Sequence, residues 1–413
     1  MISYDKALKI LNKSKLFIKS EKILVNNSLN RVCSKNIYSK FNYPAANNTA
    51  LDGFAIKSKD NIKLKKNKKL KFLILKTISA GDNPKIKKVT RFSAIEVMTG
   101  AVIPQPFDVI IPIENARLFK TKKGRYIVID KIFKKNQFIR FKGSDYKKGD
   151  IIIKKGELIN SSHILALKTL GIKQIDVKKK IRIKFYTTGN EITNKINIPS
   201  WKIRSSNNFY IKSYIHNFPV IFSENKILRD KDSHLFRKEI NKNFKNNTDI
   251  IITSGGISAG KHDFIPNVIK KFKSRLSFRG VSIRPGKPMM FTHLNKNTSF
   301  FGLPGNPISS AACFRFFVQH YIFLCLGTKS VSGKTAKLTN NFFKKKDFTR
   351  FVKGQSKVSI KGNLEFKILT GQESFRVQPF VKSNSWGLFP AGKSKFKKGD
   401  KIKCFNFSIY EDL

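Results

Sequence analysis

Apolar and polar positions change their period along the chain, and the clearest pattern lies between residues 181 and 327. Four apolar runs there are typical of strands, and they read IRIKFYTTG, FPVIFSE, DIIITSGG and TSFFGLPG. They alternate with stretches of helical period at about 207–216, 232–244, 263–273 and 306–326. Strands and helices that alternate in this way predict a largely parallel sheet covered on both faces. The segment VSIRPGKPMMF predicts a further strand pair near one edge of this sheet.

The rest of the chain has a shorter period. Apolar residues alternate with polar ones in short runs between about 55 and 140, and again from about 335 onward, which predicts a small β-rich insertion and a C-terminal β-barrel. A helix is expected from Ser161 or Ser162 to Gly171, and another at the N-terminus. We therefore expect an α/β multidomain fold of four domains. They are an N-terminal and linker domain (1–54 and 141–175), an inserted β-rich domain (55–140), a doubly wound parallel-sheet domain (176–330) and a C-terminal β-barrel domain (331–413).

Targeting and redox signals are few. The sequence contains no run of about 18 apolar residues, so we expect no membrane span. The first residues, MISYDKALKILNKSKLF, lack the continuous apolar stretch of a signal peptide, and we expect a cytoplasmic protein. The four cysteines lie far apart without a CxxC pair, which indicates neither a zinc site nor a disulfide framework.

The formal net charge of +57 has two interpretations. One is a basic nucleic-acid-binding protein, because lysine and arginine neutralise phosphates. The other is compositional drift toward the residues of A/T-rich codons, since the chain has 37 Phe against 2 Trp and its lysines occur everywhere. We favour drift, and expect weak, salt-sensitive binding to polyanions and no specific nucleic-acid partner.

Chemistry-bearing residues follow the predicted strands at their carboxyl ends, where open parallel sheets bind ligands. YTTGNE places Glu191 after the first strand, and Asp230 follows the second. TSGGISAGKHDF places Gly255, Gly256, Ser258 and Asp263 after the third strand. GLPGNPIS follows the last strand and opens a helix whose amides would face an anion, and RPGKP adds Arg284 and Lys287.

These residues together predict a site for a phosphate-bearing substrate. Anionic oxygens suit the amides and the two cations, and the acids suit a divalent metal, because magnesium takes oxygen ligands. No GxGxxG follows a strand and no GxxxxGK[ST] occurs, which argues against a redox-coenzyme site. Taken singly, the glycines could be ordinary loop glycines, Asp230 a helix N-cap, and Lys287 a surface lysine.

With these motifs, the sequence resembles the molybdopterin molybdenumtransferase family, which includes the gephyrin E domain, over nearly its whole length. TALDGFAI, VMTGAVIP and RFKGSDYKKGD resemble the family's N-terminal segments. TSGGISAGKHDF, RPGKP and GLPGNPIS are highly specific for the family when they occur in this order.

The resemblance implies a four-domain protein with a MoaB/Mog-like central domain, and a homodimer whose active site is shared between subunits. It implies adenylylated molybdopterin and molybdate as substrates, Mg²⁺ as cofactor, and molybdenum cofactor and AMP as products. The dithiolene that binds molybdenum belongs to the substrate, so no cysteine cluster is needed.

Functional residues are carried over by position. The catalytic residues would be Asp52, Thr99, Asp145, Glu191, Asp263 and Lys287, and the metal ligands Glu191, Asp230 and Asp263. The substrate-binding residues would be Gly255, Gly256, Ser258, Arg284, Pro304, Gly305, Asn306, Pro307 and Ser309.

Some positions depart from the family's pattern. Asn190, Ser144 and Ser205 stand where the family usually has an acid, and Phe107 and Phe375 where glycine is expected. The departures bear on rate and substrate affinity, and they leave a catalytically weakened scaffold on the same fold as an alternative. The acids Asp52, Glu191, Asp230 and Asp263 count against that alternative, because a scaffold would not need all four.

Overall fold

The structure is a computed structural model that describes residues 1–62, 69–257, 264–272, 277–329 and 332–407. The chain forms two compact units. Unit 1 contains residues 1–35, 155–164 and 174–413, and unit 2 contains residues 36–154 and 165–173. The four-domain division predicted from the sequence is finer than this and stays a prediction.

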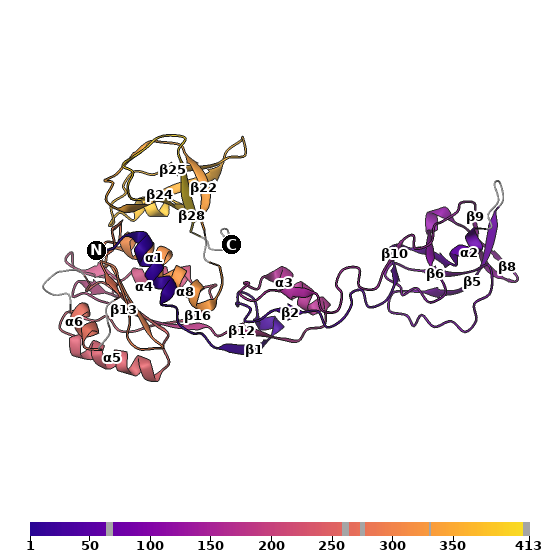
Figure 1. The fold of residues 1–413 in the computed structure, drawn as a ribbon, viewed down its shortest axis with the longest axis horizontal. Coiled ribbons are helices and arrows are strands. Elements are labelled where there is room, and N and C mark those ends of the chain that lie inside the picture. Colours follow the sequence, from indigo (N-terminus) through magenta and orange to yellow (C-terminus); the bar gives the residue numbers. More distant parts are fainter. Residues whose placement is uncertain (63–68, 258–263, 273–276, 330–331, 408–413) are drawn as a thin grey trace. The chain divides into compact units, whose positions relative to one another are not determined.

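The centre of unit 1 is a six-stranded sheet, and it confirms the predicted largely parallel sheet (Figure 1). β13 pairs in parallel with β16 and β17, and β17 pairs in parallel with β21. Two antiparallel strands extend the sheet beyond β21. The order is β16 (Val220–Glu224), β13 (Ile181–Thr187), β17 (Ile250–Ser254), β21 (Ser299–Leu303), β20 (Met290–His293) and β18 (Phe278–Arg279).

Helices cover both faces of this sheet because the strand residues alternate between two cores. Ile250 and Ile252 pack in one core with helices α1, α4, α7 and α8, whereas Ile251 packs in the other with α5 and α6. α6 is shorter than expected and begins at Ile265, next to Pro266. The helices are α1 (Tyr4–Lys13), α4 (Asn207–Tyr214), α5 (Ser233–Lys245), α6 (Ile265–Lys270), α7 (Pro307–Cys313), the π-helical η3 (Phe314–Val318) and α8 (Gln319–Leu326).

The helical run from Pro307 to Leu326 is long and apolar enough to cross a membrane by length and composition. However, 89% of its most apolar stretch is buried inside the fold. Its residues Phe314, Phe317 and Tyr321 are fully buried in the core. The run therefore has the surroundings of a core helix.

The strand pair predicted from VSIRPGKPMMF is partly wrong. β20 does extend the central sheet, but β19 (Ile283–Arg284) pairs in parallel with β24 (Thr349–Val358) of the C-terminal barrel. Pro285 and Pro288 lie between the two strands and lack the N–H that a ladder needs, so one continuous pairing cannot run through this segment.

The C-terminal barrel is confirmed. Its strands β24, β25 (Leu364–Ile368), β22 (Lys334–Leu338), β28 (Lys401–Asn406) and β26 (Ser385–Phe389) are joined in this order, and β26 pairs back with β24. Its core contains Val352, Phe366 and Phe389. The Phe316 ring of the central helix stacks on Phe351 of β24, with ring centroids 3.9 Å apart. The barrel thus shares a core with the sheet domain.

Unit 2 is built on a second six-stranded sheet, which confirms the β-rich character of this region. The order is β7 (Val109–Pro112), β4 (Gly53–Ile56), β6 (Ser93–Val97), β5 (Leu70–Ile78), β9 (Gly124–Ile129) and β8 (Arg117–Thr121). Apolar residues pack on both of its faces. Short pairs complete the fold: β3 (Asn48–Thr49) with β10 (Ile139–Arg140), β2 (Ile37–Tyr38) with β11 (Ile151–Ile153), and, in unit 1, β1 (Ser20–Leu24) with β12 (Gln174–Lys178). The helix expected near Ser161 is α3 (Ser161–Thr169).

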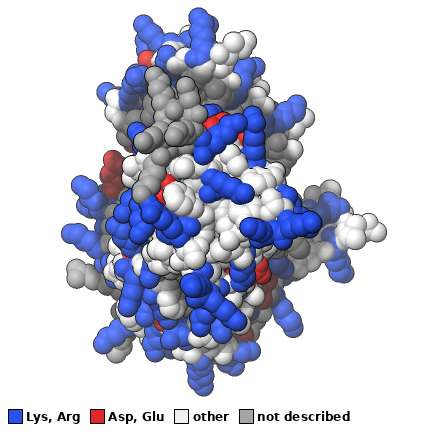
Figure 2. Space-filling view, turned by 90° about the vertical axis from the view of Figure 1, so that its right-hand side faces the viewer, with Lys and Arg blue, Asp and Glu red and all other residues white. Residues whose placement is uncertain are grey.

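Basic side chains lie at many separate places on the surface. On the face shown in Figure 2, lysine and arginine surround areas of other residues and do not gather in one stripe. On this face, the distribution fits compositional drift better than a dedicated nucleic-acid surface.

Candidate functional site

A cavity of about 760 Å³ lies at the carboxyl ends of β13, β17 and β21. The chain runs from β13 to β16 on one side and then to β17 on the other, so the strand order reverses at β13. Open α/β sheets bind their ligands at such a switch point. The cavity is therefore the candidate functional site.

Many of the residues predicted from the sequence line this one cavity. They are Glu191, Asp230, Gly255, Gly256, Pro304, Gly305, Asn306 and Pro307. Ser309 is buried inside α7, and Arg284 and Lys287 are exposed outside the cavity lining. Ser258 and Asp263 lie outside the described residues.

Glu191 lies on a loop whose backbone carbonyl oxygens are hydrogen-bonded to Arg229. Arg229 Nη1 donates to the carbonyl oxygens of Gly189, Asn190 and Ile192 at 2.9, 3.0 and 2.8 Å. Gly189 has φ +137°, and a Cβ at this position would lie 2.6 Å from Glu191 Oε2. A side chain at position 189 would therefore collide with the Glu191 carboxylate, and glycine leaves the space that the carboxylate occupies. The sequence analysis missed Arg229, although it immediately precedes Asp230.

Asn190 forms a reciprocal pair with Asp230. Asn190 Nδ2 donates to Asp230 Oδ2 at 2.7 Å, and the Asp230 amide donates to Asn190 Oδ1 at 3.2 Å. A second carboxylate at this distance would repel the first. The neutral amide of Asn190 therefore bonds to the Asp230 carboxylate without like-charge repulsion.

Asn207 forms hydrogen bonds to two other segments that line the cavity. Its Nδ2 donates to Ser254 Oγ at 2.6 Å and to the Gly305 carbonyl oxygen at 2.8 Å. The start of α4 is thereby fixed to the last residue of β17 and to the segment that follows β21. The sequence analysis missed Asn207, because this contact depends on three separate segments of the chain.

The fit of the cavity to magnesium rests on two described carboxylates, Glu191 and Asp230. Among the residues that the structure describes, no group of three or more His, Cys, Asp or Glu is placed to hold a metal ion. Magnesium is commonly held by one or two carboxylates together with substrate phosphates. The donor chemistry of this pair therefore fits a magnesium ion shared with a phosphate-bearing substrate.

The β19–β24 pairing brings two arginines together. Arg284 lies opposite Arg350 in the register of these strands. The Arg284 guanidinium lies over the Phe348 ring, 4.9 Å from its centroid. Burial, followed by the charge of Arg284, lowers the pKa of Arg350. The pair offers donors to an oxyanion, and the sequence analysis missed Arg350 because only the tertiary pairing brings it to RPGKP.

In unit 2, the structure joins two predicted residues that lie far apart in the sequence. Asp52 Oδ1 accepts hydrogen bonds from the Thr99 amide at 2.6 Å and from Thr99 Oγ1 at 2.7 Å. These two bonds lower the pKa of the exposed Asp52 carboxyl, so it is ionised at neutral pH. A Cβ on Gly53 would collide with the Ile111 carbonyl oxygen, which explains the glycine after Asp52.

Asp145 lies on a different segment of unit 2. It is exposed, and its amide donates to the Tyr43 carbonyl oxygen at 3.1 Å. Among the described side-chain contacts, none links its carboxylate to Asp52 or Thr99. The structure thus brings together two of the three predicted residues of this unit.

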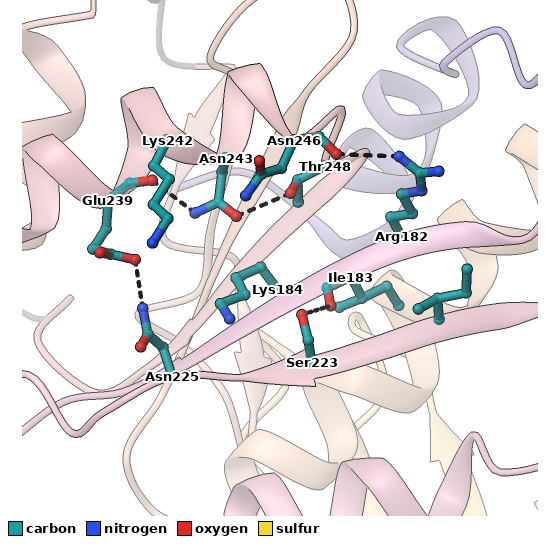
Figure 3. A pocket seen from close by; sticks show the side chains of 11 residues that line it. Arg182, Ile183, Lys184, Ser223, Asn225, Glu239, Lys242, Asn243, Asn246 and Thr248 are labelled. Carbon is teal, nitrogen blue, oxygen red and sulfur yellow. Dashed lines mark hydrogen bonds between the residues drawn. The ribbon is translucent and has the colours of Figure 1, made fainter.

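A smaller cavity of about 230 Å³ is lined by β13, β16 and α5 (Figure 3). Its polar side chains form hydrogen bonds with one another. Asn225 donates to Glu239, and Thr248 donates to Asn243 Oδ1 at 2.9 Å. Arg182 also donates to the Asn246 carbonyl oxygen at 3.2 Å. Because these groups satisfy each other beside the strands and not beyond their carboxyl ends, we assign this cavity a structural role.

Comparisons with known proteins cover the whole chain. Family models match residues 2–171 (MoeA N-terminal region, domains I and II), 184–323 (probable molybdopterin binding domain) and 335–407 (MoeA C-terminal region, domain IV). The molybdopterin molybdenumtransferase of Staphylococcus epidermidis is 28% identical over 100% of this chain and 98% of its own length. That of Haemophilus influenzae is 29% identical over 99% of each chain.

Solved structures show the same fold. A molybdopterin biosynthesis MoeA protein from Pyrococcus horikoshii superposes with a TM-score of 0.82, at 24% identity, over 98% of this chain and 99% of that chain. Three consecutive family models, full-length relatives and the fold agree with the resemblance drawn from the motifs. The chain belongs to the MoeA family, the molybdopterin molybdenumtransferases of molybdenum cofactor biosynthesis.

Proposed function

We propose that this protein inserts molybdate into adenylylated molybdopterin and releases AMP and molybdenum cofactor in a magnesium-dependent reaction. The observation that carries the proposal is that Glu191, Asp230 and the glycine- and proline-rich loops line one cavity at the switch point of the sheet. The cavity's volume of about 760 Å³ is in the range of small-molecule sites.

Each part of the site has a role in this reaction. The backbone around Gly255, Gly256 and Gly305 lets phosphate oxygens approach closely. Glu191 and Asp230 would hold Mg²⁺, which would neutralise charge on the pyrophosphate. The Glu191 carboxylate would orient the attacking water, and the exposed cations Arg284 and Lys287, which lie outside the cavity lining, would bind oxygens of molybdate or phosphate. No covalent nucleophile is required.

Adenylylated molybdopterin supplied to the purified protein with magnesium is expected to yield AMP when molybdate is present. AMP release is measured by chromatography with and without molybdate, and with and without a chelator. A protein that releases no AMP under any of these conditions would contradict the proposed reaction.

We further propose a cytoplasmic homodimer whose active sites are shared between subunits. The candidate residues fall into two groups, the Asp52–Thr99 pair in unit 2 and the cavity residues in unit 1. A site shared between subunits is what the resemblance to the MoeA family implies. Each site would then combine Asp52 of one chain with Glu191 of the other.

A further inference from the structure

Phe375 is a large apolar side chain exposed at the wall of the cavity. It is 66% exposed and lines the cavity beside the loops that follow β17 and β21. Among the described residues of the lining it is the sole aromatic side chain. It comes from the barrel, on the loop between β25 and α9 (Gln378–Val381).

The base of this loop is fixed to β24 through Gln372 and Lys353. Gln372 Oε1 accepts from the Lys353 amide at 2.9 Å, and Gln372 Nε2 donates to the Lys353 carbonyl oxygen at 2.8 Å. The Lys353 ammonium is buried and donates to the carbonyl oxygens of Glu373 and Arg376, each at 3.1 Å. Glu373 and Arg376, which lie on either side of Phe375 in the sequence, are therefore both hydrogen-bonded to Lys353.

The tip of the loop is fixed to the cavity itself. Asn306 Nδ2 donates to Ser374 Oγ at 3.1 Å, and the Ile308 amide donates to the Ser374 carbonyl oxygen at 3.3 Å. Asn306 lines the cavity next to Pro307, at the start of α7. Ser374, the residue directly before Phe375, is thus hydrogen-bonded to the segment that lines the cavity. These bonds fix the backbone next to the Phe375 ring.

We propose that Phe375 is a specificity-determining residue that stacks on a planar fused-ring heterocycle of the substrate, and that Lys353 is the positioning residue that holds its loop. The proposal rests on the proposed function, whose substrate carries two such rings, adenine and pterin. Aromatic side chains stack on such rings by their faces, and loss of one contact typically costs about 1–3 kcal/mol.

The test measures binding by isothermal titration calorimetry with three probes, AMP, 6-hydroxymethylpterin and ribose 5-phosphate. Phe375→Ala is expected to weaken binding of AMP, of the pterin or of both about tenfold, within the range for one stacking contact. Ribose 5-phosphate carries no planar ring, so its affinity is expected to stay the same. Phe375→Tyr is expected to keep wild-type affinity for all three.

Phe343→Ala is the matched control, because Phe343 is 67% exposed on the barrel but does not line the cavity. A loss for AMP alone assigns the wall to adenine, and a loss for the pterin alone assigns it to the pterin. If the wild type binds AMP and the pterin and Phe375→Ala binds both equally well, the inference fails while the proposed function stands. If the wild type binds neither, the proposed function fails and the inference fails with it.

Lys353 is tested by a double-mutant cycle. Lys353→Met removes the two bonds to Glu373 and Arg376, and it is expected to weaken binding of the ring-bearing probes in the wild-type background but not in the Phe375→Ala background. A residue that only supported the barrel would weaken both backgrounds equally. That additive result would remove Lys353 from the positioning role.

The stability of the barrel should also depend on pH through Lys353. Burial lowers the pKa of Lys353 to about 8; Glu373 opposes the shift, and Arg376 and Arg350 add to it. In the unfolded chain the pKa is about 10.4. Between these values the unfolded state binds more protons, so the free energy of unfolding of the wild type should rise with pH relative to Lys353→Met. Urea unfolding of both proteins between pH 7 and 10.5 checks this, and a constant difference would contradict it.

Discussion

Glu191→Gln is expected to lower the rate of AMP release at least about 100-fold, the scale of losing one electrostatic contact in a transition state. The variant keeps the size of the side chain and removes only its charge. The loop that carries it is held by Arg229 through three backbone carbonyls, which the substitution does not touch. The carboxylate is exposed, so the midpoint of thermal unfolding should be unchanged.

Initial rates of AMP release at saturating magnesium and molybdate measure this effect, and circular dichroism follows folding. Glu365→Gln is the control, because Glu365 is a partly exposed glutamate on the barrel strand β25 and does not line the cavity. If Glu191→Gln retained a near-normal rate, Glu191 would have no part in the chemistry.

Mixed dimers of two inactive variants are expected to recover about a quarter of wild-type activity. Asp52→Ala and Glu191→Gln would each inactivate the homodimer. Unfolding and co-refolding them in equal amounts makes roughly half of the dimers mixed. If each site combines Asp52 of one chain with Glu191 of the other, one site of a mixed dimer carries both lesions and the other carries neither.

This recovery depends on how the two groups of residues are shared and not on the exact role of either one. Native mass spectrometry measures the fraction of mixed dimers, and AMP release measures the activity. Co-refolded wild-type protein controls for losses during refolding. A mixture that stays inactive although mixed dimers are present would show that each site is built within one chain, and a protein that stays monomeric would exclude the shared site altogether.

Much of the candidate site could be predicted because its residues lie in local motifs. TTGNE, TSGG and GLPGNP each follow an apolar run directly, and the carboxyl ends of neighbouring parallel strands must meet at one edge of the sheet. Glu191, Gly255 and Pro304 therefore meet in one cavity. The pairing of Asp52 with Thr99 joins two motifs that were recognised separately. Ser258 and Asp263 lie outside the described residues, so their roles stay predictions.

The residues that the sequence analysis missed act through long-range contacts. Arg229 reaches carbonyl oxygens 37 to 40 residues away, and carbonyl oxygens have no side-chain signature. Arg350 lies opposite Arg284 only because β19 pairs with β24 of the barrel and not with the central sheet. Lys353 is one of many lysines in a chain of +57 net charge, and nothing in its sequence neighbourhood distinguishes it from the exposed ones.

The sequence by itself determined the class of the fold, the family and the positions of the polar residues after each strand. It did so because the period of apolar residues and the order of the motifs are local properties, as in the run 249–252 and the glycines Gly255 and Gly256 that follow it. Only the tertiary structure decided which polar groups bond to which, as for Asn190 with Asp230 and Lys353 with the loop of Phe375. The reason is physical: a side-chain hydrogen bond depends on positions within about 3 Å, and packing sets those positions between segments that are distant in the sequence.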